Sequence, residues 1–210
     1  MSASVLASGQ MYSVELPPWT VLLVAGASGV GKSSVSYRLA AWFGAAITPV
    51  DDIQVAVKRV TTPEQMPMLH FFDNHREEYF AMDDVGKLEH IVSVSTELLP
   101  ALEAVVANRL EEGRRVVLEG DFILPELATR QCFGEFANGG RVRGLVIYED
   151  AEAQIVANYR AREGTQQLVR ARASHTYSNW LRAEAERLGI PAVAARPWET
   201  VLERCIAAVS

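Results

Sequence analysis

The chain has 210 residues, of which 49% are hydrophobic and 22% are charged. These values are typical of a globular protein with a sizeable core, so we expect 1–210 to form a single domain. The formal net charge of −6 argues against a protein that binds nucleic acid through a basic face, and two widely separated cysteines argue against a disulfide framework. The start shows no secretory pattern, and no apolar run approaches the roughly 20 residues of a membrane helix, so we expect a cytoplasmic protein without a membrane partner.

Residues 1–18 are weakly patterned and are expected to form an N-terminal extension. Within it, 11–16 alternate like a short edge strand, which Pro17 and Pro18 end. The first core strand is expected at about 20–25, where an apolar run of β-type residues stands directly before a glycine.

Residues 26–33 read Gly-Ala-Ser-Gly-Val-Gly-Lys-Ser, which is the G-x-x-x-x-G-K-S signature of a phosphate-binding P-loop. Its glycines let the backbone wrap closely around phosphate oxygens, and successive N–H groups then form a nest for an anion. A helix expected at 32–43 adds the positive end of its dipole, and Gly44 ends it. The context of strand, loop and helix is the one that the motif requires.

In this motif Lys32 reaches the β- and γ-phosphates and the Ser33 hydroxyl binds Mg²⁺, so Lys32 is also a predicted catalytic residue. The alternative is a glycine-rich turn that binds nothing. The predicted nucleotide-binding residues of the loop are Gly26, Ala27, Ser28, Gly29, Val30, Gly31, Lys32, Ser33 and Ser34.

A second apolar strand is expected at 45–50, and it delivers two carboxylates at its carboxyl end. Asp51 is the candidate base that orients or deprotonates the phosphate acceptor, whereas Asp52 points the other way or caps the helix expected at 53–60. The alternative is that both aspartates only cap that helix.

Residues 63–83 are aromatic and irregular, and they form either a substrate cap or an ordinary packed connection. A long helical pattern follows from 85 to 110, which Pro100 is expected to kink. A third strand at 115–118 runs into Glu119 and Asp121. One of these ends the strand as a Walker-B-type carboxylate that holds Mg²⁺, with Glu119 preferred and Asp121 left open.

The next expected elements are a helix around 125–136, a turn at 138–140, a fourth strand at 142–148 and a helix at 151–162. The stretch 163–174 is polar and basic. Four arginines flank it, namely Arg160, Arg162, Arg170 and Arg172.

A mobile lid at about 160–175 could bring guanidinium groups over the phosphates, with Arg160 and Arg162 as the candidate catalytic arginines. The alternative is a solvated basic face. A helix at 177–188, a fifth strand at 191–195 and a last helix at 198–209 complete the chain. Arg196, followed by Pro197 and Trp198, is placed to stack on a nucleotide base.

Five short apolar runs alternate with helices, which predicts an α/β fold: a five-stranded parallel sheet with helices on both faces, of the P-loop NTPase type. Ligands of such sheets bind at the carboxyl ends of the strands. The P-loop, the aspartates after the second strand and the carboxylates after the third all stand at such ends, so we expect them to meet.

Four segments of the chain resemble the 2-phosphoglycerate kinase-like group of P-loop kinases. They are 26–34, 50–53, 68–70 and 113–120, which read GASGVGKSS, VDDI, MLH and GRRVVLEG. The arrangement is also similar to chloramphenicol phosphotransferase and to zeta-toxin-type kinases. The resemblance spans roughly 20–205 and implies a nucleoside-monophosphate-kinase-like fold, ATP and Mg²⁺ as cofactors, and phosphorylation of a small-molecule hydroxyl.

By that resemblance, Asp51 matches the acceptor-activating aspartate of the group, and Lys32 and Ser33 match its phosphate and Mg²⁺ ligands. Arg160 or Arg162 matches its lid arginine. The chain departs from the group in Asp52, where a serine is common, and in being shorter than a full 2-phosphoglycerate kinase.

The sequence therefore favours a kinase that transfers the γ-phosphoryl group of ATP to a hydroxylated small molecule. Two alternatives stay open. One is a nucleotide switch or ATPase that works through a protein partner, in which case the aromatic segment around 66–80 would form an exposed apolar patch. The other is a toxin-like kinase of a nucleotide sugar, which shares the same chemistry.

Overall fold

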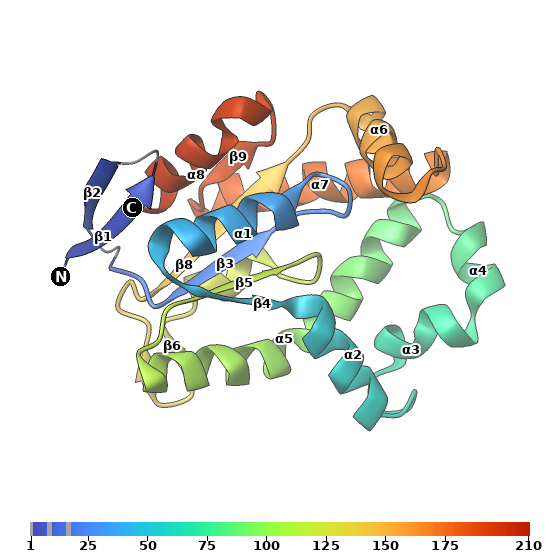
Figure 1. Ribbon diagram of the computed structural model, residues 1–210. Helices are drawn as coiled ribbons and strands as arrows, with labels where there is room; N and C mark the ends of the chain where they lie inside the picture. Colours follow the sequence, from blue (N-terminus) through green and yellow to red (C-terminus); the bar gives the residue numbers. More distant parts are fainter. Residues whose placement is uncertain (1, 8–9, 16–17) are drawn as a thin grey trace.

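Five parallel strands form the central sheet of the computed structural model, which describes residues 2–7, 10–15 and 18–210 (Figure 1). The predicted five-stranded parallel sheet is confirmed. From one edge to the other the strands are β4 (Ala46–Pro49), β5 (Val116–Gly120), β3 (Val21–Ala25), β8 (Val142–Tyr148) and β9 (Ala192–Ala194).

Helices cover both faces of this sheet (Figure 1). On one face α1 (Lys32–Phe43) contacts α8 (Val201–Val209), and on the other α5 (Asp84–Glu112) contacts α7 (Leu168–Leu188). The central strand β3 is buried at every position. A strand covered on both faces has no solvated side, which explains its unbroken apolar sequence.

The predicted helix at 32–43 is confirmed as α1. Val35, Leu39 and Phe43 recur every fourth residue and are buried against the sheet, since such spacing keeps them on one face of the helix. Gly44 ends the helix with φ of 60°, a left-handed conformation in which its N–H reaches the last carbonyls.

The predicted helix at 85–110 is confirmed as part of α5, with Pro100 inside it. In the described part of the chain, α5 is the one helix that is long and apolar enough, by length and composition, to cross a membrane. Its residues Leu102, Val106 and Leu110 nevertheless lie in the hydrophobic core beside the sheet.

The strand predicted at 45–50 ends earlier, because Val50 already begins α2 (Val50–Val60). The segment 63–83 is not irregular as predicted. It forms α3 (Pro67–Asn74) and α4 (Arg76–Ala81), which His75 separates with a non-helical φ of −132°. Pro67 suits the first turn of a helix, where its missing N–H costs nothing.

The helix predicted around 125–136 is wrong. A short 3₁₀ helix, η1 (Pro125–Thr129), precedes a small antiparallel hairpin of β6 (Cys132–Phe133) and β7 (Phe136–Ala137). Gly134 has φ of 57°, which breaks any helix, and its apolar neighbours only mimic helical spacing.

The segment 163–174 is more ordered than predicted. α6 (Glu152–Glu163) and α7 leave only 164–167 as a connection, so α7 begins nine residues before the expected 177. Ala171 and Ser174 are buried on the inner face of α7. The first turns of α7 are therefore packed through small residues, which do not produce the apolar spacing that predicts a helix.

The remaining elements lie at the two ends of the described chain. A short 3₁₀ turn, η2 (Trp198–Thr200), leads into α8, so the expected helix at 198–209 is confirmed in outline. β1 (Ser2–Ala7) and β2 (Gln10–Glu15) pair antiparallel. The strand predicted at 11–16 is therefore present, although residue 16 lies outside the described residues.

Candidate functional site

The P-loop connects β3 to α1 and forms one wall of an open cavity of about 720 Å³, which we call the P-loop cavity. Its other walls come from α2, the residue after β5, α6 and the segment before α8. The lining residues are Ala27, Ser28, Gly29, Gly31, Lys32, Ser33, Ser34, Asp51, Asp121, Asn158, Ala161, Arg162, Arg196 and Trp198. Residues distant in sequence thus meet at the carboxyl ends of the strands.

Two loop residues predicted to bind nucleotide, Gly26 and Val30, do not line this cavity. Val30 is 1% exposed in the core, and a Cβ on Gly26 would lie 2.6 Å from the carbonyl oxygen of Ile147 in β8. At Gly31, φ is 94° and a Cβ would lie 2.8 Å from the ring of Trp198. These glycines therefore also permit close packing of the loop against the protein itself.

The side chain of Lys32 is the electrostatic centre of the P-loop cavity. Its Nζ lies 2.9 Å from Oε2 of Glu119 and 3.2 Å from Oδ1 of Asp121. The Ser33 hydroxyl donates to the same Glu119 oxygen at 3.1 Å. Glu119 lies in β5 and is 6% exposed. This residue, which the sequence favoured as the Walker-B-type carboxylate, thus contacts the side chains of both Lys32 and Ser33.

Burial and charge oppose each other in this group. Burial by itself would lower the pKa of Lys32, but Asp121 and Glu119 raise it above its ordinary value. Burial raises the pKa of Asp121, while Lys32 acts in the opposite direction. The ammonium is thus held in its charged form between two carboxylates.

Asp51 and Asp52 lie in the first turn of α2, and only Asp51 lines the P-loop cavity. The helix is preceded by Pro49 and neither aspartate is its capping residue, so the reading of both as caps is wrong. Partial shielding from water raises the pKa of Asp51, against the opposing effect of Lys32. In the described chain no ion pair holds its carboxylate.

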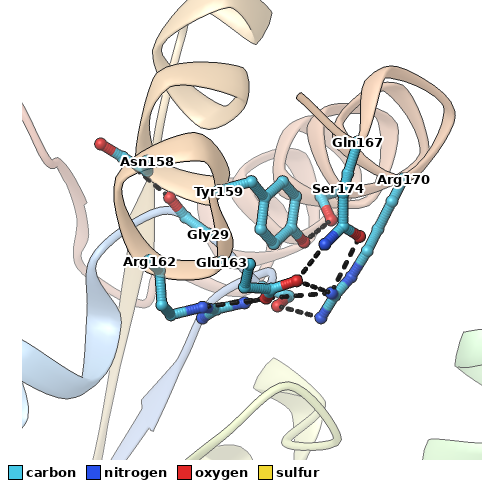
Figure 2. Close-up of polar contacts among 9 residues, drawn as sticks. Gly29, Asn158, Tyr159, Arg162, Glu163, Gln167, Arg170 and Ser174 are labelled. Atoms are coloured by element: carbon cyan, nitrogen blue, oxygen red, sulfur yellow. Dashed lines mark hydrogen bonds and ion pairs between the residues drawn. The ribbon is translucent and has the colours of Figure 1, made fainter. Parts of the chain in front are cut away.

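The arginines of the expected lid do not act alike. Arg162 lines the P-loop cavity, whereas Arg160 is exposed on α6 and does not line it. Figure 2 shows the Glu163 carboxylate between Arg162 and Arg170, at 2.5 and 3.1 Å from their guanidinium nitrogens. Arg170 lies over the Tyr159 ring, 4.5 Å from its centre, and donates to Ser28 at 3.4 Å.

Asn158, Arg196 and Trp198 also line the P-loop cavity. The Asn158 amide donates to the Gly29 carbonyl at 2.7 Å, which ties α6 to the P-loop (Figure 2). The Arg196 guanidinium lies 5.4 Å from the centre of the Trp198 ring and 3.4 Å from buried Glu149. The flat groups of Arg196 and Trp198 therefore lie next to each other in the wall of the P-loop cavity. The sequence predicted that Arg196 stacks on a nucleotide base.

A second cavity of about 820 Å³ adjoins the first, and we call it the aromatic cavity. Ser28 and Asp121 line both cavities. The lining comes from α3, α4, α5 and α7 as well as the P-loop. It consists of Ser28, Phe72, Tyr79, Phe80, Lys87, Ile91, Asp121, Gln167, Leu168, Val169, Arg170, Ala173, Ser174 and Tyr177.

Comparison with known proteins gives relatives over half of the chain, while no family model matches it. A 2-phosphoglycerate kinase from Methanococcus vannielii is 31% identical over 119 residues, covering 51% of this chain and 37% of that protein. One from Methanocaldococcus jannaschii is 28% identical over 110 residues, covering 51% and 35%. The chain thus spans little more than a third of the length of the curated relatives it matches.

Solved structures match the chain almost end to end. A gluconokinase from Sinorhizobium meliloti 1021 aligns over 93% of both chains with a TM-score of 0.50 and 17% identity. A shikimate kinase from Aquifex aeolicus covers 90% of this chain and 95% of its own, with a TM-score of 0.52 and 14% identity. The chain has the fold of the P-loop kinases.

Within this P-loop kinase fold, sequence reasoning missed Asn158 and Lys87, whereas Ser28, Asp121 and Arg170 of the aromatic cavity were named from the sequence. Asn158 is one polar residue among several in α6, and only its contact with Gly29 sets it apart. Lys87 stands in an ordinary helical pattern. Arg170 was named among the four arginines of the expected lid, but its ion pair with Glu163 could not be predicted from the sequence.

Proposed function

We propose that the protein is a kinase that transfers the γ-phosphoryl group of ATP to a hydroxyl of a small molecule. The observation that supports this most strongly is the contact between two cavities, one built on the P-loop and one on aromatic side chains, which share Ser28 and Asp121. Phosphoryl transfer requires a nucleotide and an acceptor to meet in line, and adjoining cavities allow this. ATP use is consistent with the expected cytoplasmic location.

In this proposal the P-loop amides and Lys32 bind the β- and γ-phosphates. Ser33 and Glu119 would hold Mg²⁺, because a hydroxyl and a carboxylate oxygen already lie 3.1 Å apart there and Mg²⁺ prefers such ligands. The ion would supply neutralising charge to the phosphates. Arg196 and Trp198 would hold the base by stacking.

Asp51 is the proposed base. The acceptor oxygen bonds to the γ-phosphorus as the bond from that phosphorus to the bridging oxygen of ADP breaks, and the acceptor proton passes to Asp51. Asp121 lines the aromatic cavity and Asp51 does not, but the carboxylate of Asp121 is held by Lys32 at 3.2 Å, whereas that of Asp51 forms no ion pair among the described residues. Arg162, which lines the P-loop cavity, is the proposed lid arginine.

A nucleotide switch is less well supported. That reading needs the segment around 66–80 to form an exposed apolar patch, yet Leu69 is 3% exposed and Phe72 and Tyr79 line the aromatic cavity. Phe80 alone among the large apolar residues of this segment is strongly exposed, at 56%. A toxin-like kinase of a nucleotide sugar would use the same residues and differ only in its acceptor.

The test is ADP release from ATP and Mg²⁺ in the presence of a panel of hydroxylated small molecules. We expect at least one to stimulate release, and Asp51→Asn to lower that turnover by a factor on the order of 10² while nucleotide affinity stays nearly unchanged. Asp52→Asn, one residue away and outside both cavities, is the matched control. ADP release that no acceptor stimulates would favour the switch, and an unaffected Asp51→Asn variant would remove Asp51 from the mechanism.

A further inference from the structure

Lys87 is a buried cation without a carboxylate partner in the described chain. It lies in the first turn of α5 and is only 8% exposed. Its ammonium donates to the carbonyl of Met82, and within residues 18–210 it forms no ion pair. A buried charge is costly unless an opposite charge accompanies it, and the positive end of a helix dipole adds to that cost.

Lys87 is one of the residues that line the aromatic cavity. The other charged groups of that wall already have partners: Arg170 is bound by Glu163, and Asp121 by Lys32. Two hydroxyls of the wall are also engaged, since Tyr177 donates to the Asp121 carbonyl and Ser174 bonds to Tyr159. Among the charged groups of this wall, Lys87 is therefore the one without an oppositely charged partner in the described chain.

Most of the remaining wall is apolar. Phe72 and Tyr79 contact each other edge to face with ring centres 5.0 Å apart, and Ile91, Leu168 and Val169 complete the apolar lining. Such a surface favours a ligand with an apolar body, because it offers few partners for further hydroxyls or charges.

We propose that the acceptor has an apolar body and a single anionic group, which the ammonium of Lys87 binds. This inference rests on the proposed kinase function and adds the chemical class of the acceptor. The anionic group occupies the Lys87 end, and the hydroxyl lies toward Asp121, where the two cavities meet. A compact acceptor with several negative charges is disfavoured, since only one cation of this wall lacks a carboxylate partner in the described chain.

The test compares three probes: 4-(hydroxymethyl)benzoate, its uncharged amide, and 2-phosphoglycerate. Binding to the protein loaded with Mg²⁺ and ADP is measured by calorimetry, and ADP release from ATP is measured separately. We expect the benzoate to bind at least about 30-fold more tightly than the amide, and 2-phosphoglycerate to bind more weakly than the benzoate.

Lys87→Met keeps the length of the side chain and removes its charge. It is expected to abolish the preference for acid over amide without changing ADP affinity, and Lys87→Arg is expected to restore much of it. Lys58→Met is the matched control, because Lys58 pairs with Asp73 on the outside and lines neither cavity.

The outcomes separate the two proposals. Equal binding of acid and amide, tighter binding of 2-phosphoglycerate, failure of all three probes to bind, or a preference that survives in Lys87→Met would overturn the assignment of Lys87. Acid-selective binding that Lys87→Met abolishes, with no ADP release from any probe, would support the anion site and count against the kinase function.

Discussion

The two cavities meet at Ser28 and Asp121, yet they are built in different ways. The P-loop cavity is built on a glycine-rich loop at the end of a buried strand, with Lys32 as its central charge. The aromatic cavity is lined mainly by residues of four separate helices. A backbone site holds a common chemical group such as phosphate, whereas a side-chain site can be changed residue by residue to suit one acceptor.

The largest expected effect concerns the P-loop side alone. Lys32→Met should lower kcat/KM by a factor on the order of 10³, because it removes the ammonium that would offset charge on the transferred phosphoryl group. Steady-state kinetics with varied ATP and varied acceptor would check this. The KM for the acceptor should stay close to that of Lys58→Met, which changes a lysine outside both cavities. A large rise in the acceptor KM of Lys32→Met would mean that Lys32 also contributes to binding of the acceptor in the aromatic cavity.

The pH dependence tests which carboxylate belongs to the reaction. A base works when deprotonated, so activity is present above its pKa and is lost as pH falls through it. Partial burial raises the pKa of Asp51 above its ordinary value, so kcat/KM should fall at a higher pH than an ordinary aspartate would give.

The variants Asp51→Asn and Asp121→Asn assign this acidic limb. It should vanish from the residual activity of Asp51→Asn and persist in Asp121→Asn. The reverse result would identify Asp121, which lines both cavities, as the base. Asp121 could also produce such a limb, because burial raises its pKa.

The same difference in construction explains what the sequence could predict. The five strands, α1 and the P-loop follow from local patterns, because an apolar run, a glycine motif and helical spacing each act over a few residues. Glu119 could be named as a candidate for the same reason, as a carboxylate near the end of a buried strand. Lys87 could not be found, because its significance depends on which groups three other helices bring beside it.

The errors in the fold have a related cause. The hairpin at β6 and β7 was read as a helix because spacing alone does not register the left-handed φ of Gly134. The early start of α7 was missed because Ala171 and Ser174 are too small to give an apolar signal, although both are buried.

A smaller effect is expected from adding one methyl group to the P-loop. In Gly31→Ala the new Cβ would lie 2.8 Å from Trp198 at a φ of 94°, so the loop or the indole must move. We expect ADP to bind about tenfold more weakly, as measured by calorimetry, while the benzoate probe binds as before. Gly44→Ala has a similarly positive φ of 60° but open space around it, and should lose only stability. Equal loss of both ligands in Gly31→Ala would show that the loop supports both cavities.

The smallest expected effect concerns the wall of the aromatic cavity. The buried Tyr177 hydroxyl donates at 2.7 Å to the carbonyl of Asp121, and Tyr177→Phe leaves that carbonyl without this donor. The free energy of unfolding should fall by about 1 kcal/mol in a denaturant titration, whereas Tyr37→Phe, at a residue 54% exposed, should change it little. Because this hydrogen bond positions the backbone of Asp121, we also expect acceptor KM to rise more than ATP KM. If the KM for ATP rises equally, the hydrogen bond of Tyr177 positions Asp121 for both cavities, and the two cavities are not independent at Asp121.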